Sequence, residues 1–140
     1  MPSRFKSRQQ ALQTLYLWDI RQQPVDAAIR DYYDSLASDQ GEPVEEHDQF
    51  AEQLATGTAD QAAAIDDLIG RHSEHWRLER MPAVDRNILR LATYEMRNLA
   101  TPTAVVIDQA LELARRFSTD ESLSFLNGVL DAIDKEVRVR

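Results

Sequence analysis

The spacing of apolar residues between Thr101 and Ile133 restricts the fold of this chain more than any other feature. Within this stretch, apolar side chains recur every three or four residues on both sides of a polar turn at 118–121. They are Val106, Ala110, Leu113, Phe117, Leu123, Leu126, Val129, Leu130 and Ile133. Such spacing is typical of helices that place one face in a core. We therefore predict two amphipathic helices here, which the remaining chain must cover.

Two short sequences refine this prediction. Ser118 and Glu121 have the spacing of a capping box, in which a hydroxyl and a carboxylate satisfy free amides at a helix start. Gly128 lies in the middle of the second helix, where glycine costs about 1 kcal/mol relative to alanine. We therefore expect another backbone to approach Gly128 closely. We also expect Asn127 to hydrogen-bond to that backbone rather than to contact a ligand.

Helical spacing continues through the rest of the chain. It predicts helices at about 3–22, 26–37, 44–72 and 83–99. No stretch alternates apolar and polar residues with the period of two that marks a half-buried strand. The sequence therefore predicts an all-α fold of six or seven helices. Gly57 lies inside the long third segment, and the pattern does not decide whether it bends that helix or divides it.

Composition and charge exclude several classes of protein. The 140 residues include no cysteine, which excludes disulfides and thiolate metal sites. No apolar run reaches membrane-spanning length and no signal peptide is evident, so we expect a cytoplasmic protein. The net charge of −8 is uneven: residues 1–21 hold four cations and one acid, whereas residues 22–70 hold twelve acids and one cation. This distribution predicts a local anion-binding patch on a body whose acidic segment faces water or a basic partner.

No catalytic motif is present in the sequence. The four glycines lie far apart, which excludes a phosphate-binding loop, and no cysteine is available as a nucleophile. On a helix, His72, His75 and Glu79 would share one face and could chelate a divalent cation. Two histidines without a fixed third ligand are more typical of a solvated helix end. We therefore predict no metal and no other cofactor.

Other charged residues are interpreted as solvated surface. Glu112 and Arg116 have the i, i+4 spacing of a surface ion pair on a helix. Arg86 and Arg90 have the same spacing and suit an exposed helix face, although Arg90 and Glu95 could also reach neighbouring elements. The adjacent carboxylates at 66–67 are interpreted in the same way.

The start of the chain is the best candidate for binding. Arg4, Lys6 and Arg8 lie within about one helical turn, and such a cluster can hold phosphates without a pocket. Phe5 and Tyr16 add aromatic rings that could stack on unpaired bases. The alternative is that terminal residues are charged for solubility and have no ligand. Three cations alone are a weak signal for nucleic-acid binding.

Three segments together resemble the bacterial transcription antitermination factor family NusB. Residues 8–18, RQQALQTLYLW, resemble its first helix, which runs from a basic start into Ala-Leu and Tyr-x-Trp. Residues 84–96, VDRNILRLATYEM, are similar to its Leu-Arg-x-Ala-x-Tyr-Glu-Leu segment. Residues 125–131, FLNGVLD, match its closing hairpin. The resemblance covers the whole chain in order, although residues 22–70 match only as a helical pattern.

This resemblance implies an all-α fold of two small packed bundles, residues 1–75 and 76–140, within a single RNA-binding domain. It implies no catalytic activity. Family members bind the single-stranded boxA element of ribosomal RNA leader transcripts together with a small-subunit ribosomal protein, called NusE in this role. With other Nus factors they help RNA polymerase to read through terminators. The resemblance also leaves room for a homodimer.

By position, the resemblance implies a set of RNA-binding residues. They are Arg4, Lys6, Arg8, Tyr16, Thr119, Asp120, Glu121 and Phe125. Tyr16 and Asp85 fall where the family meets its protein partner. The chain departs from the family in its thinner basic start and in Asp108-Gln109, which replaces the usual Asn-Glu.

A weak cationic edge on an acidic body should bind RNA poorly by itself, because phosphate contacts supply much of the affinity. A basic partner on the acidic surface would add charge and contact area. We therefore expect cooperative RNA binding. The main alternative is a helical adaptor that binds protein and no RNA. A methyltransferase, to which NusB-like domains are sometimes fused, is excluded for these residues because they contain no βαβ pattern or glycine-rich cofactor loop.

Overall fold

The computed structural model describes residues 3–40, 47–73 and 77–138, with the backbone alone at 38–40. All secondary structure in these ranges is helical, as expected, with seven α-helices and one short 3₁₀ helix. They are α1 (Arg4–Arg21), α2 (Val25–Gln40), α3 (Gln49–Asp60), α4 (Ala62–His72), η1 (Leu78–Arg80), α5 (Ala83–Asn98), α6 (Thr103–Phe117) and α7 (Asp120–Arg138). No helix in the described ranges is long and apolar enough to cross a membrane.

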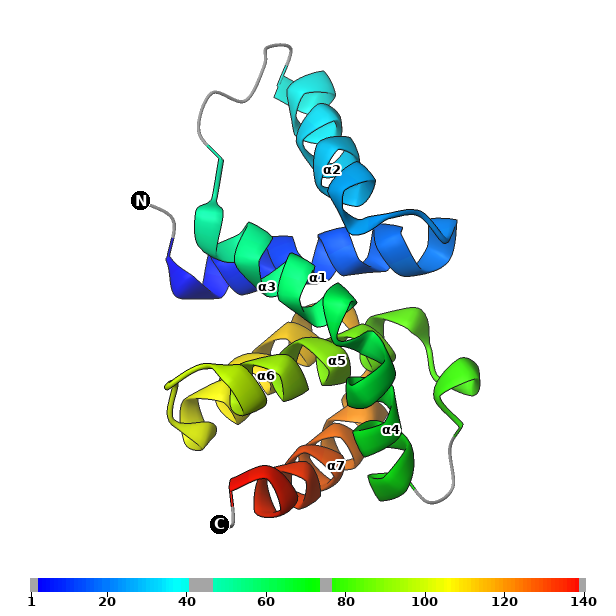
Figure 1. Ribbon diagram of the computed structural model, residues 1–140, viewed down its shortest axis with the longest axis vertical. Helices are drawn as coiled ribbons and strands as arrows, with labels where there is room; N and C mark the ends of the chain where they lie inside the picture. The colour runs from blue at the N-terminus through cyan, green and yellow to red at the C-terminus, as the bar shows by residue number, and fades with distance from the viewer. Residues whose placement is uncertain (1–2, 41–46, 74–76, 139–140) are drawn as a thin grey trace.

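The helices form two groups that share one core (Figure 1). Helices α1, α2 and α3 pack together as the N-terminal group, and α4, α6 and α7 surround α5 in the C-terminal group. Helix α5 also packs against α1 and α3, so buried leucines and isoleucines of both groups form a single cluster. Helix α4 packs on α5 and α7, and the break between α3 and α4 lies at Gln61.

The two helices predicted at the C-terminal end are present as α6 and α7. Their apolar stripes are buried at Val106, Leu113, Leu126 and Ile133, which confirms the helical spacing. Phe117 is an exception, because the last residue of α6 remains 38% exposed.

The expected close approach at Gly128 is wrong. A Cβ atom added to Gly128 would meet no described atom within 4 Å. Asn127 is exposed beside it, so no buried amide there requires a backbone partner. The fold of the described residues therefore gives neither residue a packing role.

The long third segment of the sequence is divided, but not at Gly57. Helix α3 ends at Asp60 and α4 begins at Ala62, with the break at Gln61; the expected start at 44–46 lies outside the described residues. Gly57 lies inside α3, where a Cβ would come within 2.3 Å of the Tyr94 ring on α5. This glycine is therefore required by the contact between α3 and α5.

Substituting Gly57→Ala should destabilise the fold. Alanine favours a helix by up to about 1 kcal/mol over glycine, but forcing a methyl group against the buried Tyr94 ring costs about 1–3 kcal/mol. We expect a net loss of about 1–2 kcal/mol in the free energy of unfolding, measured with urea. Gly70→Ala is the matched control, because nothing described lies within 4 Å of its Cβ position. A gain at both positions would show that Tyr94 does not restrict residue 57.

Candidate nucleic-acid interface

The first turn of α1 presents two exposed cations, Arg4 and Lys6. Ser3 caps this helix, and its side-chain oxygen accepts a hydrogen bond from the Lys6 N–H at 3.1 Å. No acidic residue lies in this turn, and positive charge at a helix N-terminus opposes the helix dipole. Helix stability therefore does not account for these cations, and their position favours contact with an external anion.

Arg8, the third predicted RNA contact, is buried. Its Nε and Nη2 donate to the two carboxylate oxygens of Glu95 at 2.9 and 2.6 Å. Its Nη1 donates to the Gln109 side-chain oxygen at 3.1 Å, which gives a structural role to a residue that departs from the family pattern. Arg8 is 6% exposed and Glu95 is 1% exposed. The positive charge of Arg8 is thus neutralised inside the fold and does not face a ligand.

Two other arginines at this end of the molecule lie on aromatic rings. The Arg4 guanidinium is 3.9 Å from the centroid of the Phe50 ring on α3. Arg116, in the last turn of α6, lies 4.5 Å from the centroid of the Phe5 ring. The predicted pair of Arg116 with Glu112 is confirmed at 3.3 Å. Sequence reasoning missed the contact with Phe5, because no spacing relates residues 5 and 116.

The turn between α6 and α7 is fastened to the start of α5 by Asp85. The Ser118 hydroxyl donates to Asp85 Oδ1, and the Ser122 hydroxyl donates to Oδ2 at 2.8 Å. Asp85 is 4% exposed. The Ser118 hydroxyl therefore binds Asp85, whereas we had expected it to form a capping box with Glu121. The carboxylate predicted to bind a partner holds the turn in place and offers little surface of its own.

A surface pocket of about 330 Å³ lies beside this turn. It is lined by Met81, Pro82, Asp85, Thr119, Glu121, Ser122 and Phe125. Four predicted site residues therefore lie together here, from two parts of the chain more than thirty residues apart. Asp120 is exposed but does not line the pocket.

Tyr16 lies apart from the cationic start of its helix. Twelve residues separate it from Arg4, which corresponds to about 18 Å along the axis of α1. Its side chain is 41% exposed, and Ile20, one turn further on, is 51% exposed. Two neighbouring exposed apolar side chains suit a protein contact better than a phosphate contact.

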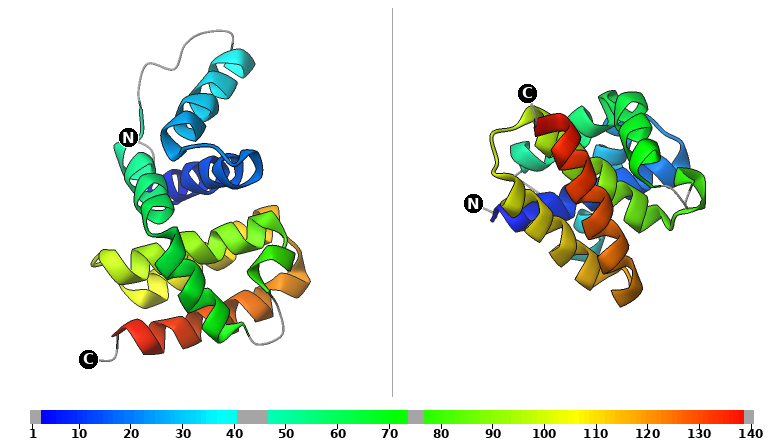
Figure 2. Two further views of the ribbon diagram at one scale, coloured as in Figure 1. Left: turned by 45° about the vertical axis from the view of Figure 1, so that its right-hand side comes forward. Right: turned by 90° about the horizontal axis from the view of Figure 1, so that it is seen from below.

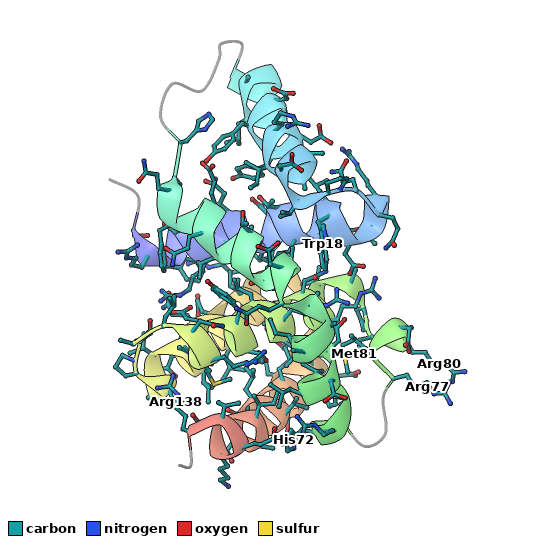
Figure 3. The ribbon with its side chains drawn as sticks, viewed as in Figure 1. Trp18, His72, Arg77, Arg80, Met81 and Arg138 are labelled. Atoms are coloured by element: carbon teal, nitrogen blue, oxygen red, sulfur yellow. The ribbon has the colours of Figure 1, made fainter. Side chains whose placement is uncertain are left out.

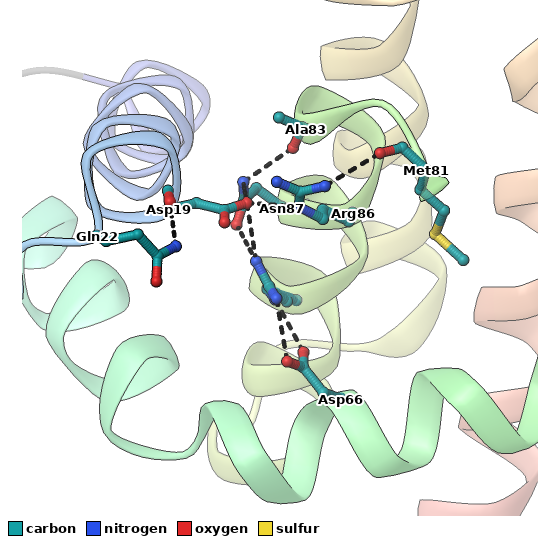
Figure 4. A network of polar contacts seen from close by, with 8 residues as sticks. Asp19, Gln22, Asp66, Met81, Ala83, Arg86 and Asn87 are labelled. Atoms are coloured by element: carbon teal, nitrogen blue, oxygen red, sulfur yellow. Dashed lines mark hydrogen bonds and ion pairs between the residues drawn. The ribbon is translucent and has the colours of Figure 1, made fainter. Parts of the chain in front are cut away.

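A buried charge network at the junction of the two groups was missed by the sequence analysis (Figure 4). Asp19 Oδ2, on α1, accepts hydrogen bonds from Arg86 Nε at 2.5 Å, Asn87 Nδ2 at 2.9 Å and Arg90 Nη1 at 3.1 Å. Arg90 also donates to both carboxylate oxygens of Asp66 on α4, at 2.8 and 3.0 Å. The interpretation of Arg86 as solvated surface is therefore wrong, and the alternative that Arg90 reaches neighbouring elements is confirmed. Asp66 remains 30% exposed.

The network changes the pKa values of Asp19 and Arg90. Burial raises the pKa of Asp19, but hydrogen bonds from Arg86 and Asn87 and the charge of Arg90 outweigh it and hold that pKa below its usual 3.8. Burial likewise lowers the pKa of Arg90, but hydrogen bonds and charge from Asp66 and Asp19 outweigh it and raise that pKa above its usual value. Both residues are therefore charged at neutral pH, and the network joins α1, α4 and α5.

The predicted alternative of a metal site finds no support among the described residues. His72, at the end of α4 (Figure 3), lies 2.9 Å from Glu136 on α7. His75 lies outside the described residues. Within the described ranges, no three His, Cys, Asp or Glu side chains gather as metal ligands would. His72 instead joins the ends of two helices.

Comparison with known proteins agrees with the resemblance in sequence. A family model described as the NusB family matches residues 5–135. The transcription antitermination protein NusB of Solibacter usitatus is 58% identical, over 98% of this chain and 92% of its own. The solved T. maritima NusB is 34% identical, with a TM-score of 0.80, covering 96% of this chain and 92% of that one. A structure of NusB and NusE in complex with dsRNA has 25% identity, a TM-score of 0.79, and coverage of 95% and 96%.

Proposed function

The chain belongs to the NusB family, and we propose on this basis that it is a transcription antitermination factor. It binds boxA-type single-stranded RNA of ribosomal RNA leader transcripts together with the small-subunit ribosomal protein NusE. By joining the elongation complex with other Nus factors, it supports processive transcription by RNA polymerase. It acts by binding, without catalysing a reaction, in the cytoplasm, where its transcript and partners are found.

The family match is the main support for this proposal, and three other observations agree with it. The family match extends over nearly the whole chain, and a relative of the same fold holds both NusE and RNA in its solved structure. The cationic start of α1 adds physical support, because Arg4 and Lys6 are exposed and unexplained by helix stability. The net charge of −8 supports a basic partner on the remaining surface.

We assign the RNA contacts to two places on this surface. Arg4 and Lys6 hold phosphates at the start of α1, and the α6–α7 turn, residues 119–121, continues the path to Phe125. Arg8 is left out, because its guanidinium is bound to Glu95. Tyr16 belongs to the partner contact. Asp85 acts on both contacts indirectly, by holding the turn through Ser118 and Ser122.

Charge reversal at Arg4 and Lys6 tests the RNA-binding role. The double variant Arg4→Glu, Lys6→Glu should weaken binding of a boxA RNA by tenfold or more in an anisotropy titration, because two phosphate contacts become repulsive. Its complex with NusE on a sizing column should be unchanged. Arg30→Glu is the control, because this exposed arginine lies on α2, where it pairs with Asp26.

Two outcomes would separate the alternatives. Unchanged RNA affinity in the double variant would favour an adaptor that binds protein alone. Loss of RNA binding with an intact NusE complex would support antitermination. The same column reports whether the chain by itself runs as a monomer or as a homodimer.

A further inference from the structure

We infer that Arg116 is a phosphate-binding residue of this RNA surface and supplies the positive charge that the buried Arg8 does not. The inference rests on the proposed RNA binding. It extends the binding surface to the end of α6, which the sequence comparison did not assign.

Arg116 lies close to the cationic start of α1. Its guanidinium lies over Phe5, between Arg4 and Lys6 in the chain, so the end of α6 meets the cationic start of α1. Figure 2 shows the start of α1 beside α6 when the molecule is seen from below. Arg116 is also three residues before Thr119, which limits their Cα separation to about 11 Å. It therefore lies between the two groups of predicted RNA contacts and joins them into one surface.

Arg116 is exposed to solvent, unlike Arg8. Its side chain is 53% exposed, whereas that of Arg8 is 8% exposed. The pair with Glu112 is an exposed contact between neighbouring turns, and such pairs stabilise a helix little. The pair with Glu112 therefore does not by itself account for an arginine at this position.

The contact between the Arg116 guanidinium and the Phe5 ring affects how Arg116 can bind a ligand. An arginine that stacks on an aromatic ring uses the face of its planar guanidinium, and its N–H donors point outward in the plane. The Phe5 ring therefore orients Arg116. Its Nε donates to Glu112 at 3.3 Å, and its two Nη groups, for which the described residues show no hydrogen bond, face a phosphate that arginine can bind in a bidentate manner. Arg4 has the same arrangement over Phe50. The two stacked arginines form a pre-organised edge for the phosphates of single-stranded RNA.

The test is a titration of boxA RNA with the full chain and NusE at several salt concentrations. Arg116→Gln should weaken binding about three- to tenfold. It should also reduce the slope of log K against log salt by about 0.7, the value for one phosphate contact in a single strand. Arg116→Lys keeps the charge and loses the bidentate geometry, so it should keep the slope and lose part of the affinity.

Arg30→Gln is the matched control, because Arg30 is also an exposed arginine with an acid four residues before it. It should change neither affinity nor slope. If Arg116→Gln matches the wild type while Arg4→Gln weakens binding, the inference fails and the proposed function stands. If the wild-type chain with NusE does not bind the RNA, both fail. If Arg30→Gln lowers the slope as Arg116→Gln does, the effect is one of net charge and the inference is overturned.

Discussion

Replacing Arg8 by Met will lower the free energy of unfolding by about 3–5 kcal/mol, because the carboxylate of Glu95 is then buried without a partner. Glu95 is 1% exposed and accepts both of its close hydrogen bonds from Arg8. Water cannot replace those donors without opening the contact between α1 and α5. Urea denaturation followed by circular dichroism measures the loss.

The double variant Arg8→Met, Glu95→Leu provides the control. Removing both charges leaves no unpaired group, so most of the lost stability should return, as is common for buried ion pairs. RNA affinity, measured where each variant is folded, should be close to that of the wild type. If Arg8→Met instead keeps wild-type stability and loses RNA binding, Arg8 contacts RNA and our assignment is wrong.

Substituting Asp19→Ala should have a second large effect, about 3–5 kcal/mol of unfolding free energy. The change removes the carboxylate that pairs with Arg86 and one of the two carboxylates that pair with Arg90. Asp66→Ala is the matched control: it removes a partner of the same Arg90, but Asp66 is 30% exposed and water can replace it. We expect its cost to be about 1 kcal/mol. Equal losses in the two variants would show that burial of Asp19 is unimportant.

The effect of Asp19 depends on pH. The pKa of Asp19 is lower in the folded chain than its usual 3.8, so the ionised form stabilises the fold. This contribution is complete above the unfolded-state pKa and disappears as the pH falls through the lower, folded-state pKa. The difference in stability between wild type and Asp19→Ala should therefore be constant from neutral pH to about pH 5 and should shrink below about pH 4. A difference that grows on acidification would contradict the assigned direction.

The helical architecture could be predicted from the sequence because it depends on local spacing. The periods at 83–99 and 101–133 correspond to α5, α6 and α7 within a few residues. The break at Gln61 could not be found in this way, since apolar spacing continues on both sides of it. The sequence showed only that Gly57 is a glycine within a predicted helix. Glycine is required there because the Tyr94 ring, 37 residues away in the chain, occupies the space of a Cβ atom.

The burial of Arg8 could have been predicted from the sequence. Arg8, Leu12, Leu15 and Asp19 follow one another at helical spacing and lie on the same buried face of α1. That face could have been recognised, and it would have placed both charged residues in the interior. We grouped Arg8 with Arg4 and Lys6 by nearness in sequence, whereas Arg8 lies one turn further along the helix, where α5 covers it. Their partners Glu95 and Arg86 could be found only from the packing of α5 against α1.

The central claim is that the chain binds boxA RNA as one half of a joint surface with NusE. Its most direct test is an anisotropy titration of a labelled boxA RNA with the chain alone, NusE alone and the two together, at one fixed salt concentration. We expect the two proteins together to bind at least tenfold more tightly than either alone. Equal affinity for the chain with and without NusE, or no binding in either case, would contradict the claim.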